Sequence, residues 1–383
     1  MATAFVQGHG IGALNVSAPA VWPRACSPCG GMRVARARRP RRVAKPVNMA
    51  IDPWSISSDA VDKLAAGIFP LSLAPYLTFL YFIGKDRASC PQTARRGFQF
   101  LLVFVAVTIP AGITAKVVYN DILANVDWLH GSAESFLVVT NVIVAEGFRR
   151  ALTANQNKQQ RESENVASVM GTKLQKAVIP LGLSALFLAS FGIGPEHGHL
   201  EPVNALSFPT WMIHVSSLLE WLAAMAYVWN YAEQADNIRY RGLTWAMVPL
   251  HTSGILACTY HFFYNDKSVG LLVVFQALLT LIGNTTLAFA AYRIANDPKP
   301  FAEDEKGSAS FAELDASTFW ISNLIATFVL SAVIKYGELY TDLAFDFRSV
   351  PVAMGLVGML TAVNCAKWLS RSGSLPKQVA DWL

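Results

Sequence analysis

The chain has 383 residues, of which 53% are hydrophobic and only 15% are charged, and its mean hydropathy is +0.35. An ordinary soluble domain carries about a quarter charged residues, so this composition argues against a water-soluble protein. The net charge of +5 does not indicate nucleic-acid binding, because the first 51 residues carry +8 with no acidic residue and the remainder carries about −3.

Residues 1–50 are rich in Ala, Arg, Pro and Gly and lack an apolar run long enough for a secretory signal. This composition predicts a disordered, removable organelle transit peptide, with a plastid favoured over a mitochondrion as the destination. Cys26 and Cys29 fall inside it. The remaining cysteines are too scattered for a zinc site or a disulfide framework: Cys90, Cys258 and Cys365.

Apolar runs close to the length that crosses a roughly 30 Å hydrocarbon layer recur through the rest of the chain. Nine such spans are predicted: 64–84, 98–119, 132–148, 176–194, 211–230, 243–263, 271–292, 319–337 and 351–369. Pro110 lies inside the second span, where neighbouring helices can satisfy the carbonyl that it leaves free. The predicted fold class is all-α, a polytopic transmembrane helix bundle of about nine spans.

Lys and Arg are distributed unevenly over the connections, with 18 on one side of the predicted bundle and 5 on the other. The positive-inside rule places the basic side, and with it the C-terminus, in the stroma. Two polar linkers are predicted on that side, at 151–173 and 296–318. The resulting units are a three-helix domain at 51–150, a four-helix domain at 174–295, two C-terminal helices at 319–369 and a stromal tail at 370–383.

Ionisable and polar side chains recur in three consecutive spans, where burial in lipid is costly and each needs a partner. At helical spacing they fall on narrow faces, which predicts a polar seam between these spans. Its members are Ser217, Glu220, Gly254, Cys258, Gln276, Thr280 and Asn284.

Three histidines in the same spans are candidate cofactor ligands, since imidazole binds a chlorophyll magnesium, a haem iron or a transition metal. They are His214, His251 and His261. His251 and His261 lie about 15 Å apart along their helix, so they cannot share one ion. The alternative is that these histidines only fix helix packing through hydrogen bonds to Glu220 or to backbone carbonyls.

A second group of possible ligands lies in the segments opposite the predicted stromal side. It consists of His130, Glu134, His197 and His199. Imidazole and carboxylate ligands of this kind suit a divalent cation. Acidic residues are also favoured at helix N-termini for electrostatic reasons alone, which is the alternative explanation for Glu134.

No zinc-protease, phosphate-loop, nucleophile-elbow or dinucleotide motif occurs, and the clustered histidine boxes of a membrane di-iron oxygenase are missing. Glu146 lies three and four residues before Arg149 and Arg150, which predicts an ordinary helical ion pair. The sequence therefore favours a protein that is not an enzyme.

Four segments carry a family resemblance: PTWMIHVSSLLEW (209–221), RGLTWAMVPLH (241–251), ACTYHFFYN (257–265) and LTLIGNTTLAFAAY (279–292). With them, the stretch from Pro209 to Ile294 resembles a small membrane-protein family of plastids and cyanobacteria, ycf forty-nine-like. Residues 64–150, with FVAVTIPAGITAKVVY (104–119) and NVDWLHGSAESFLVVTN (125–141), look like a second uncharacterised domain of the same lineages. The resemblance implies a plastid membrane, with the thylakoid favoured over the inner envelope, and no particular reaction.

These observations lead to the expectation of a non-enzymatic thylakoid protein that assists the biogenesis or organisation of a photosynthetic complex. Its expected partners are the lipid bilayer and photosystem subunits or assembly factors, with chlorophyll or haem as a cofactor of the histidines. The alternative is a membrane transporter for an ion or small metabolite that uses Glu220 and the intramembrane histidines.

Overall fold

The structure, a computed structural model, describes residues 58–163, 199–202, 204–234, 237–296 and 316–373, which belong to one compact unit. Within these ranges the regular structure is helical and includes no strand, which confirms the all-α class. Several predictions fall outside the described residues. They are the transit peptide at 1–50, the span 176–194, His197, the second linker up to residue 315 and most of the tail.

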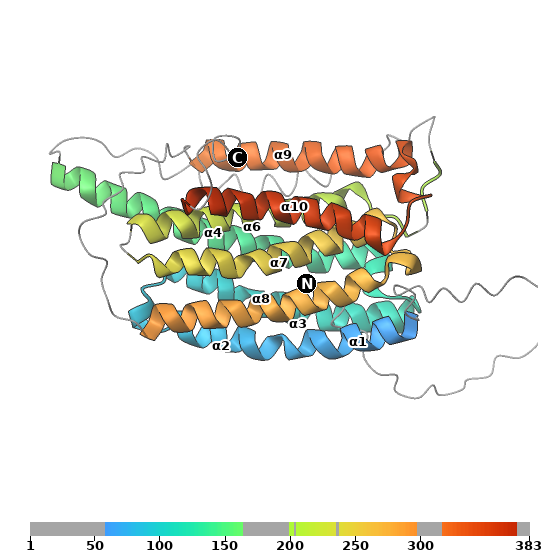
Figure 1. Cartoon of the computed structure of the whole chain (residues 1–383), viewed down its shortest axis with the longest axis horizontal. Coiled ribbons are helices and arrows are strands. Elements are labelled where there is room, and N and C mark those ends of the chain that lie inside the picture. Colours follow the sequence, from blue (N-terminus) through green and yellow to red (C-terminus); the bar gives the residue numbers. More distant parts are fainter. Residues whose placement is uncertain (1–57, 164–198, 203, 235–236, 297–315, 374–383) are drawn as a thin grey trace, which may run out of the picture. The chain divides into compact units, whose positions relative to one another are not determined.

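The helices run along a common direction (Figure 1). Their bounds are α1 Ser58–Leu71, α2 Leu73–Ile83, α3 Gln92–Val118, α4 Asp127–Ser163, α6 Phe208–Gln234, α7 Arg239–Phe262, α8 Leu271–Asn296, α9 Ala316–Gly337 and α10 Val350–Arg371. Each of the eight predicted spans that fall on described residues coincides with one of these helices or, for the first span, with α1 and α2 together.

Within the described residues, six helical segments are long and apolar enough to cross a membrane. They are Lys63–Ile83, Gln92–Val118, Phe208–Gln234, Lys267–Asn296, Thr318–Tyr340 and Val350–Arg371. The more polar α7 packs against α6, α8 and α10, and Gly242 is its one exposed residue. Because α7 faces other helices and not lipid, it can carry polar side chains that a lipid-facing helix could not.

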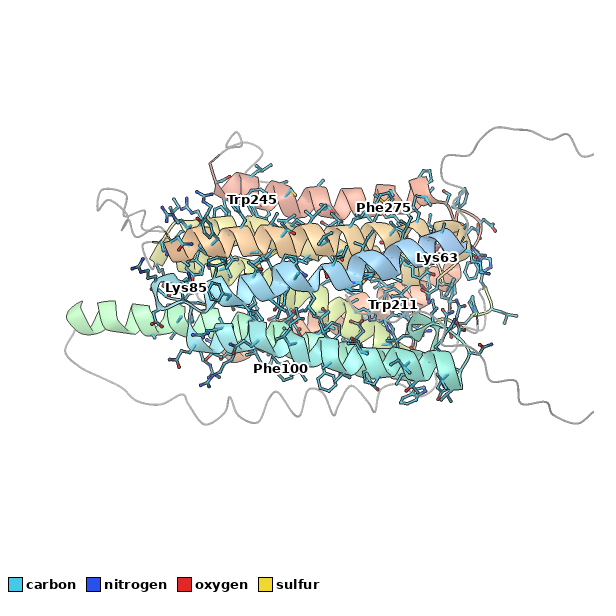
Figure 2. All side chains as sticks on the ribbon, turned by 90° about the horizontal axis from the view of Figure 1, so that it is seen from below. Lys63, Lys85, Phe100, Trp211, Trp245 and Phe275 are labelled. Atoms are coloured by element: carbon cyan, nitrogen blue, oxygen red, sulfur yellow. The ribbon has the colours of Figure 1, made fainter. Side chains whose placement is uncertain are left out.

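The connections between helices gather at two opposite ends, as the alternation of basic residues predicts. At one end Tyr240 Oη donates to the Ala88 carbonyl at 2.7 Å, and Arg371 Nη2 to Asn230 Oδ1 at 2.7 Å. This end, which holds Lys85 at the end of the first predicted span, is called the basic end below. Figure 2 shows Lys63 near the opposite end of that span.

At the opposite end, three contacts join connections that lie far apart in the sequence. The Ser207 N–H donates to Asp127 Oδ1 at 2.9 Å, Asn265 Nδ2 to the Ala124 carbonyl at 3.2 Å, and Arg348 Nη1 to Asp266 Oδ2 at 3.0 Å. Because Asp127 begins α4 and Ser207 directly precedes α6, these two helices both start at this end, whereas α3, which ends before Ala124, and α7, which ends before Asn265, both finish here.

The first predicted linker differs from the structure, because α4 continues as a helix to Ser163. The segment 151–163 contains Ala, Gln, Lys, Arg and Glu, which are strong helix formers, and it lacks Pro and Gly. Polarity was thus a poor guide to the end of the helix. The part from 164 to 173 lies outside the described residues.

Two glycines set the close packing of α3 against α4. A Cβ at Gly147 would lie 2.2 Å from the backbone nitrogen of Ala94, and one at Gly97 would lie 2.8 Å from the backbone nitrogen of Val144. Small residues of this kind let two helix backbones approach within a membrane. The approach fixes how α4 presents its inner face to α6.

Candidate metal centre

Three imidazole rings from three different helices meet inside the bundle. His130 of α4, His214 of α6 and His261 of α7 have ring centroids 4.8 to 5.0 Å apart, and one nitrogen from each lies within 4.8 Å of the others. Their side chains are buried, with exposed fractions of 0%, 7% and 3%. These three residues are called the histidine triad below.

Each helix places its histidine near the end of the bundle opposite the basic end. His130 lies in the first turn of α4, which begins at Asp127, and the Asp127 carboxylate accepts the backbone N–H of Ser207 just before α6. His214 lies two turns into α6, where its ring packs edge-on against Trp211, the tryptophan labelled in Figure 2. His261 lies at the last turn of α7.

The turn that follows His261 has an unusual backbone. Tyr264 and Asn265 have φ values of 53° and 55°, in the left-handed region that non-glycine residues rarely adopt. The conformation is held from outside, because Asn265 Nδ2 donates to Asn125 Oδ1 at 2.8 Å and Asn204 Nδ2 donates to the Tyr264 carbonyl. Local strain stabilised by surrounding contacts often accompanies functional positions, and here it fixes His261 against the connection that leads to His130.

Hydrogen bonds identify the nitrogen atoms that point inward. His214 Nδ1 lies 3.0 Å from the Thr210 carbonyl, which can only accept, so Nδ1 carries the proton and Nε2 keeps its lone pair. That Nε2 lies 3.1 Å from His130 Nε2. A carbonyl that fixes the tautomer of a histidine in this way is the usual outer partner of a metal ligand.

A simple hydrogen bond between two imidazoles would account for only part of this arrangement. His261 Nδ1 is buried and has no hydrogen-bond partner among the described residues. Buried polar atoms are rarely left unsatisfied. Two nitrogens bound at about 2.0–2.1 Å to one tetrahedral ion lie roughly 3.3 Å apart, close to the observed 3.1 Å. The triad therefore suits one transition-metal ion, for which imidazole is a preferred ligand.

The space beside these rings is small compared with a tetrapyrrole pocket. A cavity lined by His214, Glu134 and Cys258 has a volume of about 30 Å³. Pockets for ligands of that size measure about 300 Å³ or more. Chlorophyll or haem as the ligand of His214 and His261 stays a prediction, and the small volume of this cavity favours a single ion.

His251, the third predicted cofactor ligand, lies apart from the triad. Its Nδ1 is 3.2 Å from Asn364 Nδ2, and Asn364 Oδ1 accepts from Trp368 Nε1 at 2.8 Å. Since an amide nitrogen can only donate, His251 Nδ1 is the acceptor and the ring proton lies on Nε2. His251 joins α7 to α10, which agrees with the packing role considered from the sequence.

The predicted metal ligands that fall on described residues do not all lie together. His130 belongs to the triad, and Glu134 lies one turn further along α4 beside His214. His199 lies elsewhere, where its ring stacks on Phe345 and its Nε2 is 3.0 Å from Asp342 Oδ1. His130, Glu134 and His199 lie at the same end of the bundle, but a shared end does not determine which of them meet.

The predicted polar seam consists of separate contacts. Ser217 accepts from Asn141 Nδ2 of α4 at 3.0 Å, and Thr280 shares a 2.8 Å hydrogen bond with Ser253. Asn284 faces another neighbour, because its Nδ2 donates to the Ser72 carbonyl at 2.9 Å. Gly254 packs against Leu218, and Ser216 Oγ donates to Glu220 Oε1 at 2.5 Å. The Gln276 carbonyl accepts from Ser253 Oγ at 3.0 Å, and Cys258 lines a cavity with His214.

Sequence reasoning missed the partner residues Asn141, Ser253 and Asn364. Asn141 and Asn364 lie inside predicted spans, and a search for every uncharged polar residue at membrane depth would have found them.

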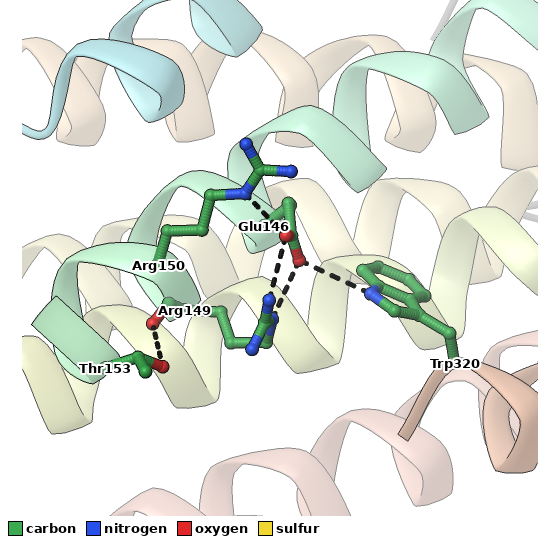
Figure 3. Close-up of polar contacts among 5 residues, drawn as sticks. All are labelled: Glu146, Arg149, Arg150, Thr153 and Trp320. Carbon is green, nitrogen blue, oxygen red and sulfur yellow. Dashed lines mark hydrogen bonds and ion pairs between the residues drawn. The ribbon is translucent and has the colours of Figure 1, made fainter. Parts of the chain in front are cut away.

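Glu146 behaves as predicted (Figure 3): its carboxylate accepts from Arg149 Nε at 2.8 Å and from Arg150 Nε at 2.6 Å. It also accepts from Trp320 Nε1 at 3.4 Å, which joins α4 to α9.

The fold and the site define a multi-pass α-helical membrane protein with a three-histidine site between its helices. Comparisons with known protein families match two separate regions of the chain. A family described as "Protein of unknown function (DUF2499)" matches residues 205–293, and one described as "Protein of unknown function (DUF3593)" matches residues 65–153. The triad draws His130 from the second region and His214 and His261 from the first.

Two relatives match over most of their own length. The chain is 52% identical over 92 residues to the "Ycf49-like protein" of Synechocystis sp., covering 88% of that protein and 24% of this chain. It is 35% identical over 88 residues to the "Uncharacterized protein ycf49" of Cyanophora paradoxa, covering 86% of that protein and 23% of this chain. The chain belongs to the Ycf49-like family. No solved structure matches it.

Proposed function

We propose that this protein binds one transition-metal ion at the histidine triad and serves, without catalysing a reaction, in the biogenesis or organisation of a photosynthetic complex in the thylakoid membrane. The observation that carries the proposal is the meeting of three buried imidazoles from α4, α6 and α7, with ligand nitrogens within 4.8 Å of one another. Three neutral imidazoles suit Zn²⁺, Cu²⁺, Fe²⁺ or Ni²⁺ better than Mg²⁺ or Ca²⁺, which prefer oxygen ligands.

The ion would also hold the bundle together. Its three ligands come from helices that otherwise touch through apolar side chains and single hydrogen bonds, and ion binding to a folded state stabilises that state. A protein of this kind can deliver or sense an ion while its outer helices contact photosystem subunits or assembly factors.

The cellular setting follows from the family and from the start of the chain. The relatives named above come from a cyanobacterium and from Cyanophora paradoxa, and the first 51 residues have the composition of a transit peptide. Occurrence in a cyanobacterium supports a membrane of a photosynthetic lineage, and the choice of the thylakoid over the inner envelope is part of this proposal.

Metal analysis of the full chain, purified in detergent without a histidine tag, tests the binding proposal. We expect close to one transition-metal ion per chain, and its loss in a variant with His130, His214 and His261 replaced by Ala. The matched control is His251→Ala, which removes a buried histidine of α7 outside the triad and should retain the ion. A well-folded wild-type chain that takes up no ion would refute the proposal.

The wider role is tested separately in a strain that lacks the gene. We expect native gels of labelled thylakoid membranes to show delayed assembly of a photosynthetic complex. Restoration by the wild-type gene and not by the triad variant would tie the role to the ion. Assembly of both photosystems at normal rates would exclude this role.

A second candidate function is transport of the ion, in the class of the transporter considered from the sequence. The observation that favours it is a second cavity, of about 50 Å³, which reaches His251 and shares Ser217 and Gly254 with the cavity beside the triad. Flux of the ion into proteoliposomes, lost in the triad variant and reduced in Glu220→Gln, would support transport over a fixed site.

A further inference from the structure

A cavity adjoins the histidine triad at His214, the triad member that lines it. On each of the three helices, the residue one turn away from the triad member lines it: Glu134 follows His130 by four positions, Ser217 follows His214 by three, and Cys258 precedes His261 by three. Residues three or four apart share a helix face, so the cavity and the triad occupy the same inner faces.

The cavity has the size and the lining that water requires. Its volume of about 30 Å³ exceeds the roughly 10–15 Å³ needed for one water molecule. Its wall offers a carboxylate from Glu134, a hydroxyl from Ser217 and a thiol from Cys258, and a buried water needs two to four such partners. The rest of the wall is apolar and consists of Leu137, Ile213, Leu218, Gly254 and Ala257, together with His214 itself.

An adjoining cavity continues this polar space toward the middle of the bundle. It has a volume of about 50 Å³ and shares Leu137, Ser217, Leu218 and Gly254 with the first. Asn141 lines it, and the Asn141 Oδ1 atom is buried without a hydrogen-bond partner among the described residues. An unsatisfied carbonyl oxygen on a wall of this kind is what an internal water molecule satisfies.

These observations bear on how the ion is coordinated. Three protein ligands leave a tetrahedral ion one position short, and structural sites fill that position with a fourth residue whereas open sites fill it with water. The group of ligand atoms that meet consists of three histidines, and Glu134 and Cys258 are not members of it. The water-sized cavity, which His214 itself lines, is the space beside the triad that a small fourth ligand can occupy.

We infer that the ion at the triad keeps one coordination position open to the cavity lined by Glu134, Ser217 and Cys258, where it binds an exchangeable water or a small monoanion. The inference rests on the proposed metal site and defines it as an open site. The Glu134 carboxylate accepts a hydrogen bond from the bound water and so positions it. Ligands larger than a few atoms are excluded by the volume.

Cobalt provides a direct test, since the visible absorption of Co²⁺ depends on the number and type of its ligands. The full chain in detergent is loaded with Co²⁺ and titrated with sodium azide. We expect a saturable change in the visible spectrum. In Ala257→Leu, which fills the cavity, Co²⁺ should still bind and the azide response should be lost. Gly355→Leu adds the same bulk where no atom lies within 4 Å of the new Cβ, so it should respond like the wild type.

The outcomes separate this inference from the proposal on which it rests. Absence of bound Co²⁺ would refute the metal site itself. Bound Co²⁺ that ignores azide in the wild type would refute only the open position. A thiolate-to-cobalt charge-transfer band that disappears in Cys258→Ser would show that Cys258 fills the position, and would also overturn the inference.

Discussion

His130 and His214 are 84 residues apart in the sequence, and their Nε2 atoms lie 3.1 Å apart between α4 and α6. The Thr210 carbonyl fixes the proton of His214 on the other nitrogen, so a lone pair faces His130. The pair belongs to two regions that match different family descriptions, and this contact, completed by His261, is the strongest reason to regard the two regions as one functional unit.

Metal binding should stabilise the chain measurably. At a free ion concentration about one hundred times the Kd, binding to the folded state adds about 2.7 kcal/mol to the free energy of unfolding. We therefore expect the unfolding temperature in detergent to rise on addition of Zn²⁺ and to fall again with a chelator. His214→Ala should abolish the shift and His199→Ala should keep it. An equal shift in both variants would point to ions bound elsewhere.

Helix packing at Gly147 should tolerate no larger residue. In Gly147→Ala the new Cβ would lie 2.2 Å from the backbone nitrogen of Ala94, so α3 and α4 must move apart, at a cost of about 1–3 kcal/mol or more. Gly355→Ala meets no atom within 4 Å and should stabilise α10 by up to about 1 kcal/mol. Unfolding in mixed detergent and dodecyl sulfate measures both. Equal stability of the two variants would contradict the packing described for α3 and α4.

The ion pairs of Glu146 should contribute unequally. The Arg149 side chain is 7% exposed and the Arg150 side chain 58%, while both donate to the same carboxylate. Glu146→Ala removes the charge that compensates a buried guanidinium and should cost about 3 kcal/mol, whereas Arg150→Ala should cost less than about 1 kcal/mol. The same unfolding assay orders the two, and the reverse order would disprove this account of the cluster.

Stability should depend on pH through Asp266, in the connection between α7 and α8. Burial raises the pKa of this carboxyl, but hydrogen bonds from Ser268 and the charge of Arg348 outweigh burial, and the pKa is lowered overall. A lowered pKa in the folded state stabilises the fold at pH values above the ordinary aspartate pKa of about 3.9, and this stabilisation is lost as the pH falls through the lower folded value. We expect the unfolding temperature to drop on acidification through this range.

The control for that prediction is Asp266→Asn, which cannot titrate. Its unfolding temperature should start lower at neutral pH and fall less steeply with acid. If the wild type and the variant gave parallel curves, the ion pair between Asp266 and Arg348 would contribute no stability.

Much of the helical layout could be predicted from local sequence. The predicted span 211–230 lies within α6 and 243–263 coincides closely with α7, because a hydrocarbon layer imposes a minimum length of apolar helix that can be read directly from the residues. The start of α4 at Asp127 and its extension to Ser163 were missed, since helix ends outside the apolar region depend on capping and helix propensity, which hydropathy does not measure.

For the candidate site, the individual residues could be recognised from the sequence, but their grouping could not. His214 and His261 were recognisable as costly residues for a membrane helix, whereas His130, just before the predicted span 132–148, was recognised only as a possible ion ligand. They were assigned to two different sites, because spacing along one helix shows which residues share a face and not which helix that face meets. His251 and His199 carried equally strong local signals and proved to be held by Asn364 and Asp342.

By itself, the sequence determined that this chain forms apolar helices of membrane-spanning length, with basic residues concentrated on one side, because those properties depend on composition over about twenty neighbouring residues. Only the tertiary structure decided which polar groups meet. That choice depends on how closely helix backbones approach, as at Gly97 and Gly147, and on single contacts such as Asn265 to Asn125 that fix the rotation of one helix against another.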